Sequence, residues 1–430
     1  MSKPAYDKPV QLDPSAPDIA RWLRPGDAVV LGEAASEPQL LASALRAAQP
    51  AVGPLTLFLG VTLADGFGPD AHPDLRFASF GAMGRNAALS RAGRLDVVAS
   101  HYSQLPSLFD AGLLRADVVL VQLSRAEGQS GYSLGPTHDY LVNAARRARV
   151  VIAEVNALAP WTHGAPWPDD LRIDAIVHSE RALPEWPAVR IGEVERRIAA
   201  HAIGFIGDGA TLEVGLGNAP EAVAAALAGH RHLGVHSGLI TDTLLPLVDC
   251  GAIDNSRKPL DAGVSVAGQL FGTSALYRRA HCNPAFAVRP PSHTHDIRVL
   301  AALPAYTAIN SALEVDLVGQ VNAELAGRSY LGGVGGQVDF VRGAMLSRGG
   351  CSLTVLPSTA RDGKASRIVA RAPSRVTTAQ SDVDVVVTEW GAAHLRGQTL
   401  RERVRRMLAI ADPGFRDELE REARESGLLG

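Results

Sequence analysis

Residues 27–48 read DAVVLGEAASEPQLLASALRAA, and this stretch predicts the kind of fold that the chain adopts. Asp27 to Leu31 is a short apolar run typical of a buried strand, and Gly32 to Pro38 is a glycine-containing loop. Gln39 to Ala48 then carries apolar residues at helical spacing. A strand, a loop and a helix in this order form the repeating unit of a parallel sheet with crossover helices.

The same order recurs along both halves of the chain. Further apolar runs that we interpret as strands span residues 55–59, 97–99, 118–122, 149–155, 211–214, 233–236, 263–270, 296–301, 308–317, 352–356 and 384–387. Between the halves, residues 160–187 are rich in Pro and Trp and show no clear periodicity. Because a single core rarely exceeds about 250–300 residues, we predict two related open α/β domains, an N-terminal one at 1–185 and a C-terminal one at 186–430.

Composition excludes several classes of protein. The 42 basic and 45 acidic side chains give a net charge of -3, so no basic excess is present to neutralise nucleic-acid phosphates. No apolar stretch approaches the ~20 residues of a membrane-spanning helix, and residues 1–17 lack the apolar core of a secretory signal. Cys250, Cys282 and Cys351 are too far apart in sequence for a disulfide framework or a metal knuckle. We therefore expect a cytoplasmic protein.

Two glycine-rich loops are candidate ligand sites. The first, GLGNAP at 215–220, follows a strand and precedes a helix, so that free amides and the helix dipole could face a phosphate. We place Pro220 at the first helical position, and a plain strand-to-helix turn is the alternative. The second loop, GGVGGQ at 332–337, suits a narrow acyl or pantetheine channel or an oxyanion, with a flexible hairpin as the alternative.

Three weaker patterns leave alternatives open. GYSLG at 131–135 matches the nucleophile-elbow pattern around Ser133, but no strand directly precedes it, so a serine hydrolase is a minor alternative. His293 and His295 alternate in the predicted strand 296–301 and its approach, yet a hydrogen-bonding role is favoured over metal binding and we expect no metal site. Glu314, Asp316 and Glu324 lie near the end of an apolar run, where open α/β sheets bind ligands, and an ordinary salt-bridged edge is the alternative.

Long motifs of the second half resemble the acetyl-CoA hydrolase/transferase family, which includes the 4-hydroxybutyrate CoA-transferases. The stretches that carry the resemblance are AINSALEVDLVGQVNAE (308–324), GGVGGQVDFVR (332–342), LPSTA (356–360), VTEWGAAHLRG (387–397) and DGATLEVGLGNAP (208–220). In the first half, GEAASEP (32–38), GYSLGPTHD (131–139) and VIAEVN (151–156) fit more weakly.

The resemblance implies two α/β domains of the CoA-transferase type with an acyl-CoA site at their interface. It also implies a homodimer that binds no cofactor permanently and uses acyl-CoA and a small carboxylic acid as substrates. Transferases of the family work through a glutamate that attacks the thioester and becomes a glutamyl-CoA thioester. The matching loops imply coenzyme A contacts at Gly215, Gly217, Asn218, Gly333, Gly335 and Gly336, and a contact of Lys364 near the nucleotide end.

The sequence departs from the family at the nucleophile. Residues 233–240 read LGVHSGLI, so Gly238 stands where the family's glutamate would be. Two other carboxylates are candidates for catalysis. Glu33 follows the first strand, where it could face the cleft between the domains, and Glu324 lies in a stretch that resembles the family's own, which favours a structural or CoA-contact role.

Beside the minor serine-hydrolase alternative, three functions that involve acyl-CoA therefore remain open at the level of the sequence. CoA transfer is the first. In the second, water held in the space left by Gly238 hydrolyses the acyl-CoA, with the amides of 332–336 stabilising the oxyanion and a nearby carboxylate acting as base. In the third, the chain binds acyl-CoA without turnover.

Overall fold

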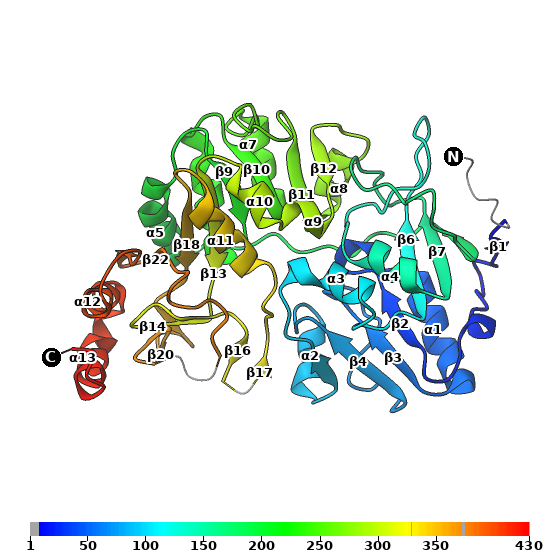
Figure 1. Ribbon diagram of the computed structural model, residues 1–430, viewed down its shortest axis with the longest axis horizontal. Coiled ribbons are helices and arrows are strands. Elements are labelled where there is room, and N and C mark those ends of the chain that lie inside the picture. Colours follow the sequence, from blue (N-terminus) through cyan, green and yellow to red (C-terminus); the bar gives the residue numbers. More distant parts are fainter. Residues whose placement is uncertain (1–7, 328, 372–374, 430) are drawn as a thin grey trace. The chain divides into compact units, whose positions relative to one another are not determined.

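The computed structural model describes residues 8–327, 329–371 and 375–429. Residues 1–7, part of the segment in which we expected no secretory signal, lie outside this description. The chain forms two compact units (Figure 1). The first unit comprises residues 1–187, 266–293 and 329–335, and the second comprises 188–265, 294–328 and 336–430. We predicted a single division between residues 185 and 186. The first unit ends its longest segment at residue 187 but also includes two segments from the second half, so the domain boundary stays a prediction.

The first unit contains a sheet in which all paired strands are parallel, in the order β1-β8-β7-β6-β2-β3-β4-β5. The strands are β1 (Val10–Gln11), β2 (Ala28–Leu31), β3 (Leu55–Phe58), β4 (Leu75–Ser79), β5 (Leu95–Val97), β6 (Val118–Leu123), β7 (Val150–Asn156) and β8 (Ala175–Ser179). Every residue of β2, β6 and β7 is buried, and all are apolar except Gln122, Glu154 and Asn156, which explains why these strands read mainly as apolar runs. β8 lies inside the segment 160–187 that showed no clear periodicity.

Helices flank this sheet, and α1 contributes Leu40, Leu41 and Leu45 to its apolar core. The helices of the first unit are α1 (Gln39–Val52), α2 (Asn86–Arg91), α3 (Leu105–Asp110), α4 (Leu141–Arg147) and α8 (Ser274–Ala280). The segment 266–293 also carries most of β11 (Ser265–Leu270), β12 (Phe286–Val288) and the start of α9 (Pro291–Thr294). β17 (Ser329–Tyr330) completes the unit.

In the second unit, strands follow the order β10-β9-β13-β18-β22-β23, and only the β22–β23 pair is antiparallel. These strands are β9 (Thr211–Val214), β10 (Gly234–Ile240), β13 (Tyr306–Ser311), β18 (Cys351–Val355), β22 (Val385–Thr388) and β23 (Gly391–His394). The two mainly parallel sheets confirm the predicted α/β class. Short strands beside them are β14 (Glu314–Asp316), β15 (Val321–Asn322), β16 (Leu325–Ala326), β19 (Thr359–Ala360), β20 (Ala365–Ser366) and β21 (Ile368–Val369).

The helices of the second unit are α5 (Glu193–Ala202), α6 (Asn218–Ala225), α7 (Leu245–Asp249), α10 (Ile297–Ala301), α11 (Gln337–Leu346), α12 (Leu400–Ile410) and α13 (Arg416–Glu425). Among the described residues, no helix is both long enough and apolar enough to cross a membrane.

Three details of the predicted secondary structure are wrong. Residues 297–301 form the helix α10 rather than a strand, because the Asp296 side chain caps it by accepting a hydrogen bond from the Arg298 amide at 2.8 Å. His293 and His295 therefore do not alternate on a strand. Pro220 is the third residue of α6 rather than the first. A proline, which has no amide hydrogen, is tolerated there because amides in the first turn of a helix have no partner within the helix. The predicted strand 308–317 is split between β13 and β14.

Candidate functional site

Glu33 is a fully buried carboxylate at the carboxyl end of β2. The Val61 amide, which follows β3, donates to its Oε2 at 2.8 Å. The Tyr102 hydroxyl donates to Oε1 at 2.5 Å, and the Gln269 side-chain amide donates to the same oxygen at 2.7 Å. Three donors from separate segments of the first unit thus fix the orientation of this carboxylate.

Gln269 reaches Glu33 because residues 136–138 pair with β11. The Leu270 amide donates to the Pro136 carbonyl at 2.7 Å, and the His138 amide donates to the Gly268 carbonyl at 2.9 Å. These bonds on either side of Gln269 fix its backbone. The motif GYSLGPTHD, which sequence analysis linked to the family, therefore positions a donor on the candidate catalytic carboxylate.

The environment of Glu33 changes its acidity. Burial raises the pKa of Glu33 to about 7, against the opposing effect of its hydrogen bonds from Tyr102, Val61 and Gln269. Burial also raises the pKa of Asp139, and the charge of Glu33 adds to this rise. At neutral pH the Glu33 carboxyl is divided between its two protonation states, so it can act as a nucleophile or exchange a proton.

A cavity of about 440 Å³ lies in the first unit next to this segment. Gly32 and Glu37 line it from the loop that carries Glu33, and Phe67, Arg46 and Arg181 line other parts. Burial raises the pKa of Glu37 to about 8, so this carboxyl is mostly protonated at neutral pH. The volume is within the range of small-molecule sites, roughly 300–1,000 Å³.

Ser133 is held by a local network. Its Oγ accepts hydrogen bonds from the Gly135 and Thr162 amides at 3.1 and 3.2 Å, and it can donate to the Thr162 carbonyl at 3.2 Å. The side chain is completely buried. Among the described residues, no histidine is a recorded partner of this hydroxyl, so its contacts support a structural role rather than a serine nucleophile.

The loop between β9 and α6 contains the first group of predicted CoA contacts. Gly215 donates its amide to the Ile309 carbonyl at 2.8 Å, and a β-carbon there would come within 2.7 Å of Asn310 Oδ1. Gly217 has a φ of 131° and precedes α6, which begins at Asn218. Packing thus explains the glycine at 215, and backbone conformation explains the glycine at 217.

The second glycine loop is divided between the two units. The carbonyl of Gly332 accepts the Ala82 amide at 2.7 Å, and the carbonyl of Gly335 accepts the Tyr102 amide at 2.9 Å. A β-carbon on Gly333 would come within 2.9 Å of the Phe80 carbonyl oxygen. Close backbone contact within the first unit therefore explains the glycine at 333, whereas Gly336 precedes α11 in the second unit.

The remaining predicted site residues lie in the second unit. Glu324 is buried between β15 and β16, and its Oε1 accepts a hydrogen bond from the Thr377 hydroxyl at 2.9 Å. Its amide donates to Asn322 Oδ1 at 3.1 Å, so Glu324 helps to hold this loop. Lys364 is exposed in the turn between β19 and β20. Gly238 is half-buried in β10, and it has no side chain to attack a substrate.

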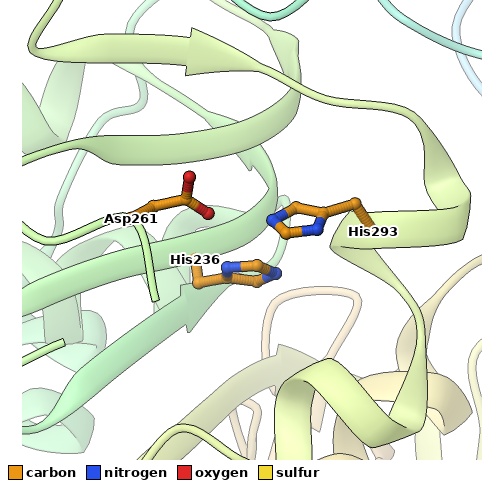
Figure 2. A group of neighbouring side chains, drawn as sticks. All are labelled: His236, Asp261 and His293. Carbon is orange, nitrogen blue, oxygen red and sulfur yellow. The ribbon is translucent and has the colours of Figure 1, made fainter. Parts of the chain in front are cut away.

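Figure 2 shows His236 of β10 with its ring beside the Asp261 side chain, and it also labels His293. A ring nitrogen of His236 and a carboxylate oxygen of Asp261 lie within 4.8 Å of each other. The backbone carbonyl of His236 accepts a hydrogen bond from the Tyr306 hydroxyl at 2.9 Å, which anchors this part of the strand. His236 lies two positions before Gly238 on β10, and Asp261 lies beside its ring.

Sequence reasoning missed Tyr102 and Gln269. Gln269 is 236 positions from Glu33, and no local pattern links the two residues. The only signal was indirect, since the family-like motif at 131–139 is the segment that pairs with β11. Only the tertiary structure makes the donor set of Glu33 visible.

Two mainly parallel α/β sheets with glycine loops at strand ends define a class of protein that binds its ligands at the carboxyl ends of the strands. Family models agree with this class. The acetyl-CoA hydrolase/transferase N-terminal domain matches residues 6–176, and the C-terminal domain of the same family matches residues 272–423. The chain belongs to the acetyl-CoA hydrolase/transferase family, as the sequence motifs predicted.

Individual relatives share most of their length with the chain. The 4-hydroxybutyrate coenzyme A transferase of Clostridium kluyveri is 40% identical over 77% of this chain and 78% of its own. The succinyl-CoA:cyclohexane-1-carboxylate CoA transferase of Geobacter metallireducens is 32% identical over 98% of each chain. The crystal structure of RipA from Yersinia pestis superposes with a TM-score of 0.90, at 31% identity and 98% coverage of each chain.

Proposed function

We propose that this protein transfers coenzyme A between an acyl-CoA thioester and a small carboxylic acid. The observation that carries the proposal is the similarity, over 77% and 98% of the chain, to two relatives that bear CoA transferase names. We propose further that the protein is a cytoplasmic homodimer and that acyl-CoA is bound only as a substrate. The acyl group is expected to be that of a small acid, since the relatives' names refer to 4-hydroxybutyrate and cyclohexane-1-carboxylate.

Glu33 is our proposed nucleophile, because Gly238 supplies none. The ionised carboxylate oxygen forms a bond to the thioester carbonyl carbon, the carbon–sulfur bond breaks, and a mixed anhydride and CoA thiolate result. The thiolate then attacks the Glu33 carbonyl, and the donor acid leaves as a carboxylate. The acceptor carboxylate repeats these steps in reverse order and takes the CoA. Tyr102 and Gln269 hold the attacking group in one orientation.

The coenzyme is proposed to contact Gly215, Gly217, Asn218, Gly333, Gly335 and Gly336, with Lys364 near its nucleotide end. The first amides of α6 and the positive end of its dipole favour an anionic group such as a phosphate. Glu324 is the second carboxylate candidate. Its hydrogen bond to Thr377 supports a role in shaping the loop beside the coenzyme.

Chemical trapping tests the nucleophile. The protein is incubated with acyl-CoA, treated with borohydride, and its peptides are mapped by mass spectrometry. Reduction at Glu33, lost in Glu33→Gln and retained in Glu154→Gln, supports the proposal. Glu154 is a matched control, because it is also buried in the first unit and accepts hydrogen bonds from the Leu40 amide and Ser179. Reduction at Glu324 or at another residue would remove Glu33 from this role.

Hydrolysis is the second candidate function, since the family name covers both activities. The two are separated by incubating the protein with acyl-CoA, with and without carboxylate acceptors. Acyl exchange without net release of thiol indicates transfer, whereas thiol release that does not depend on an acceptor indicates hydrolysis. Binding of acyl-CoA in calorimetry with neither reaction would indicate a protein that only binds the ester.

A further inference from the structure

The space that a side chain at position 238 would occupy is partly filled by two rings. A β-carbon on Gly238 would lie 3.1 Å from Cζ and 3.2 Å from Cε2 of Phe340. It would also lie 3.4 Å from Nε2 of His295. The two Phe340 distances are tighter than ordinary van der Waals contact, and the His295 distance is at the lower limit of ordinary contact. A β-carbon alone therefore requires a small shift of the Phe340 ring and lies directly against the His295 ring. A longer side chain adds atoms at a position that is already crowded.

The same two rings lie against Gly336. A β-carbon on Gly336 would come within 2.5 Å of His295 Nε2 and within 2.9 Å of Phe340 Cε2. His295 thus inserts its ring edge between two glycines that are far apart in sequence. The rings of His295 and Phe340 contact each other with centroids 4.5 Å apart. The two glycines and the two rings form one packed cluster within the second unit.

His295 has a fixed place in this cluster. Its Nδ1 and the Thr294 hydroxyl are 2.8 Å apart, and Asp296 directly after it begins the α10 helix. The side chain is only 5% exposed, and burial lowers its pKa to about 3. A ring that stays neutral at physiological pH is a weak base and carries no charge. His295 therefore occupies space at this site without replacing the chemistry of a carboxylate.

We propose that His295, with Phe340, closes position 238 to a nucleophilic side chain, so that β10 cannot supply the attacking group. The glycine at position 238 and the histidine at position 295 then go together, because the ring of His295 occupies space that a larger side chain at 238 would need. His295 is a positioning residue in this sense: it determines which part of the protein can hold the nucleophile. The inference rests on the proposed function, and it explains why the carboxylate must come from elsewhere in the chain.

The test combines substitutions in a four-member cycle: the parent protein, Gly238→Glu, His295→Ala and the double variant. Thermal unfolding without ligand measures whether the two sites are coupled. We expect Gly238→Glu to lower the melting temperature by several degrees in the parent and clearly less when residue 295 is alanine. Gly229→Glu, made with and without His295→Ala, is the matched control, because a β-carbon on Gly229 meets nothing within 4 Å. Its effect is expected to be the same in both backgrounds.

Formation of a CoA adduct at residue 238 distinguishes the proposed role of His295 from a purely structural one. After incubation with acyl-CoA, the double variant is expected to carry a CoA thioester on the peptide that contains residue 238. Gly238→Glu alone is expected to carry none there. Calorimetry with CoA is run on all four proteins, so that a failure to bind coenzyme, which contradicts the proposed function, is distinguished from a failure of the packing inference.

Equal destabilisation by Gly238→Glu in both backgrounds would overturn the inference. So would a CoA adduct at residue 238 in the single variant, or a double variant that binds CoA but forms no adduct. If the double variant does not fold, Gly238→Ala with and without His295→Ala gives the same comparison with a smaller side chain. Additive effects in that cycle count against the inference, and a loss of stability relieved by His295→Ala supports it.

Discussion

At the scale of single residues, two positions matter most: Gly238, which has no carboxylate, and Glu33, whose carboxylate is buried. Gly238 lies on a strand that resembles the family's nucleophile strand but has no reactive side chain. Glu33 lies in another unit of the chain, completely buried and bound by three donors. Because burial raises the pKa of Glu33 to about 7, its reactivity is expected to depend on pH within the physiological range.

Tyr102→Phe is expected to move the pH profile of CoA transfer to higher pH. Attack needs the ionised form of Glu33, so the rate of the parent protein rises with pH through about 7. The Tyr102 hydroxyl donates to this carboxylate and favours the ionised form, so its removal raises the pKa of Glu33. A hydrogen bond to a charged group is worth about 1.5–3 kcal/mol, which corresponds to a shift of roughly one to two pH units.

The measurement is kcat/KM against pH for the parent, Tyr102→Phe and Glu33→Gln. Glu33→Gln is expected to lose at least about 100-fold in kcat/KM at every pH. A profile of Tyr102→Phe that coincides with the parent's would contradict this assignment. The aromatic ring remains in the variant, so its contact with Phe80 is preserved as an internal control for packing.

Ser133→Ala is expected to leave the CoA-ester activity of the folded protein largely intact. The hydroxyl binds the backbone of Gly135 and Thr162, so its loss destabilises the fold by about 1–3 kcal/mol. Activity per folded molecule, measured beside the melting temperature, checks this expectation. An inactive variant with an unchanged melting temperature would revive the serine-hydrolase alternative.

At the scale of elements, the turn from β9 into α6 determines whether helix amides are available to a ligand. Gly217 has φ and ψ of 131° and 158°, a conformation that residues with a β-carbon rarely adopt. A side chain there would therefore change the path of the chain into Asn218. The eight-residue α6 carries the acidic Glu221 in its first turn, where the Thr243 hydroxyl donates to it at 2.6 Å.

Gly217→Ala is expected to weaken CoA binding by about tenfold or more, since backbone strain of this kind is worth roughly 1–3 kcal/mol. Isothermal calorimetry with CoA measures the change. Gly229→Ala is the control, because a β-carbon at this position lies in open space. If both variants bind CoA as the parent does, the loop before α6 is only a structural turn.

At the scale of the whole molecule, buried carboxyl groups link stability to pH. Burial raises the pKa of Glu33 to about 7 and the pKa values of Glu37 and Glu213 to about 8, from ordinary values of 4.5. Between about pH 4.5 and 8 the unfolded chain has lost these protons while the folded chain still holds them. The folded state therefore binds more protons in this window, and its stability falls as the pH rises.

Glu213→Gln tests this linkage. The variant keeps an oxygen that can accept the hydrogen bond from the Asn310 side-chain amide, which lies 2.6 Å from Glu213, but it has no proton to lose. Its melting temperature is expected to fall less than the parent's between pH 5 and pH 9, by a difference of several degrees. Glu402→Gln is the control, since hydrogen bonding to Arg406 lowers the pKa of that half-buried carboxylate and it stays ionised throughout the window. Identical pH profiles of the parent and Glu213→Gln would contradict the expectation.

Local patterns in the sequence were enough to predict most of the buried strands and the family. Fully buried parallel strands such as β2, β6 and β7 are mostly apolar, so they are visible as short local runs. β8 was missed because it lies in a Pro- and Trp-rich segment, and α10 was mistaken for a strand because its five residues are too few to show a helical period. Long motifs identified the family, and the resemblance implies that Gly238 stands where the family's glutamate would be.

The arrangement of the candidate site, in contrast, depends on contacts between segments that are far apart in sequence. The donors to Glu33 come from segments after β3 and β5 and from β11, and their convergence depends on strand pairing rather than on neighbouring residues. The contact of His295 with Gly238 likewise joins positions that no local pattern connects. Local sequence specifies backbone conformation and burial, whereas pKa values and steric closure arise from atoms that folding brings together.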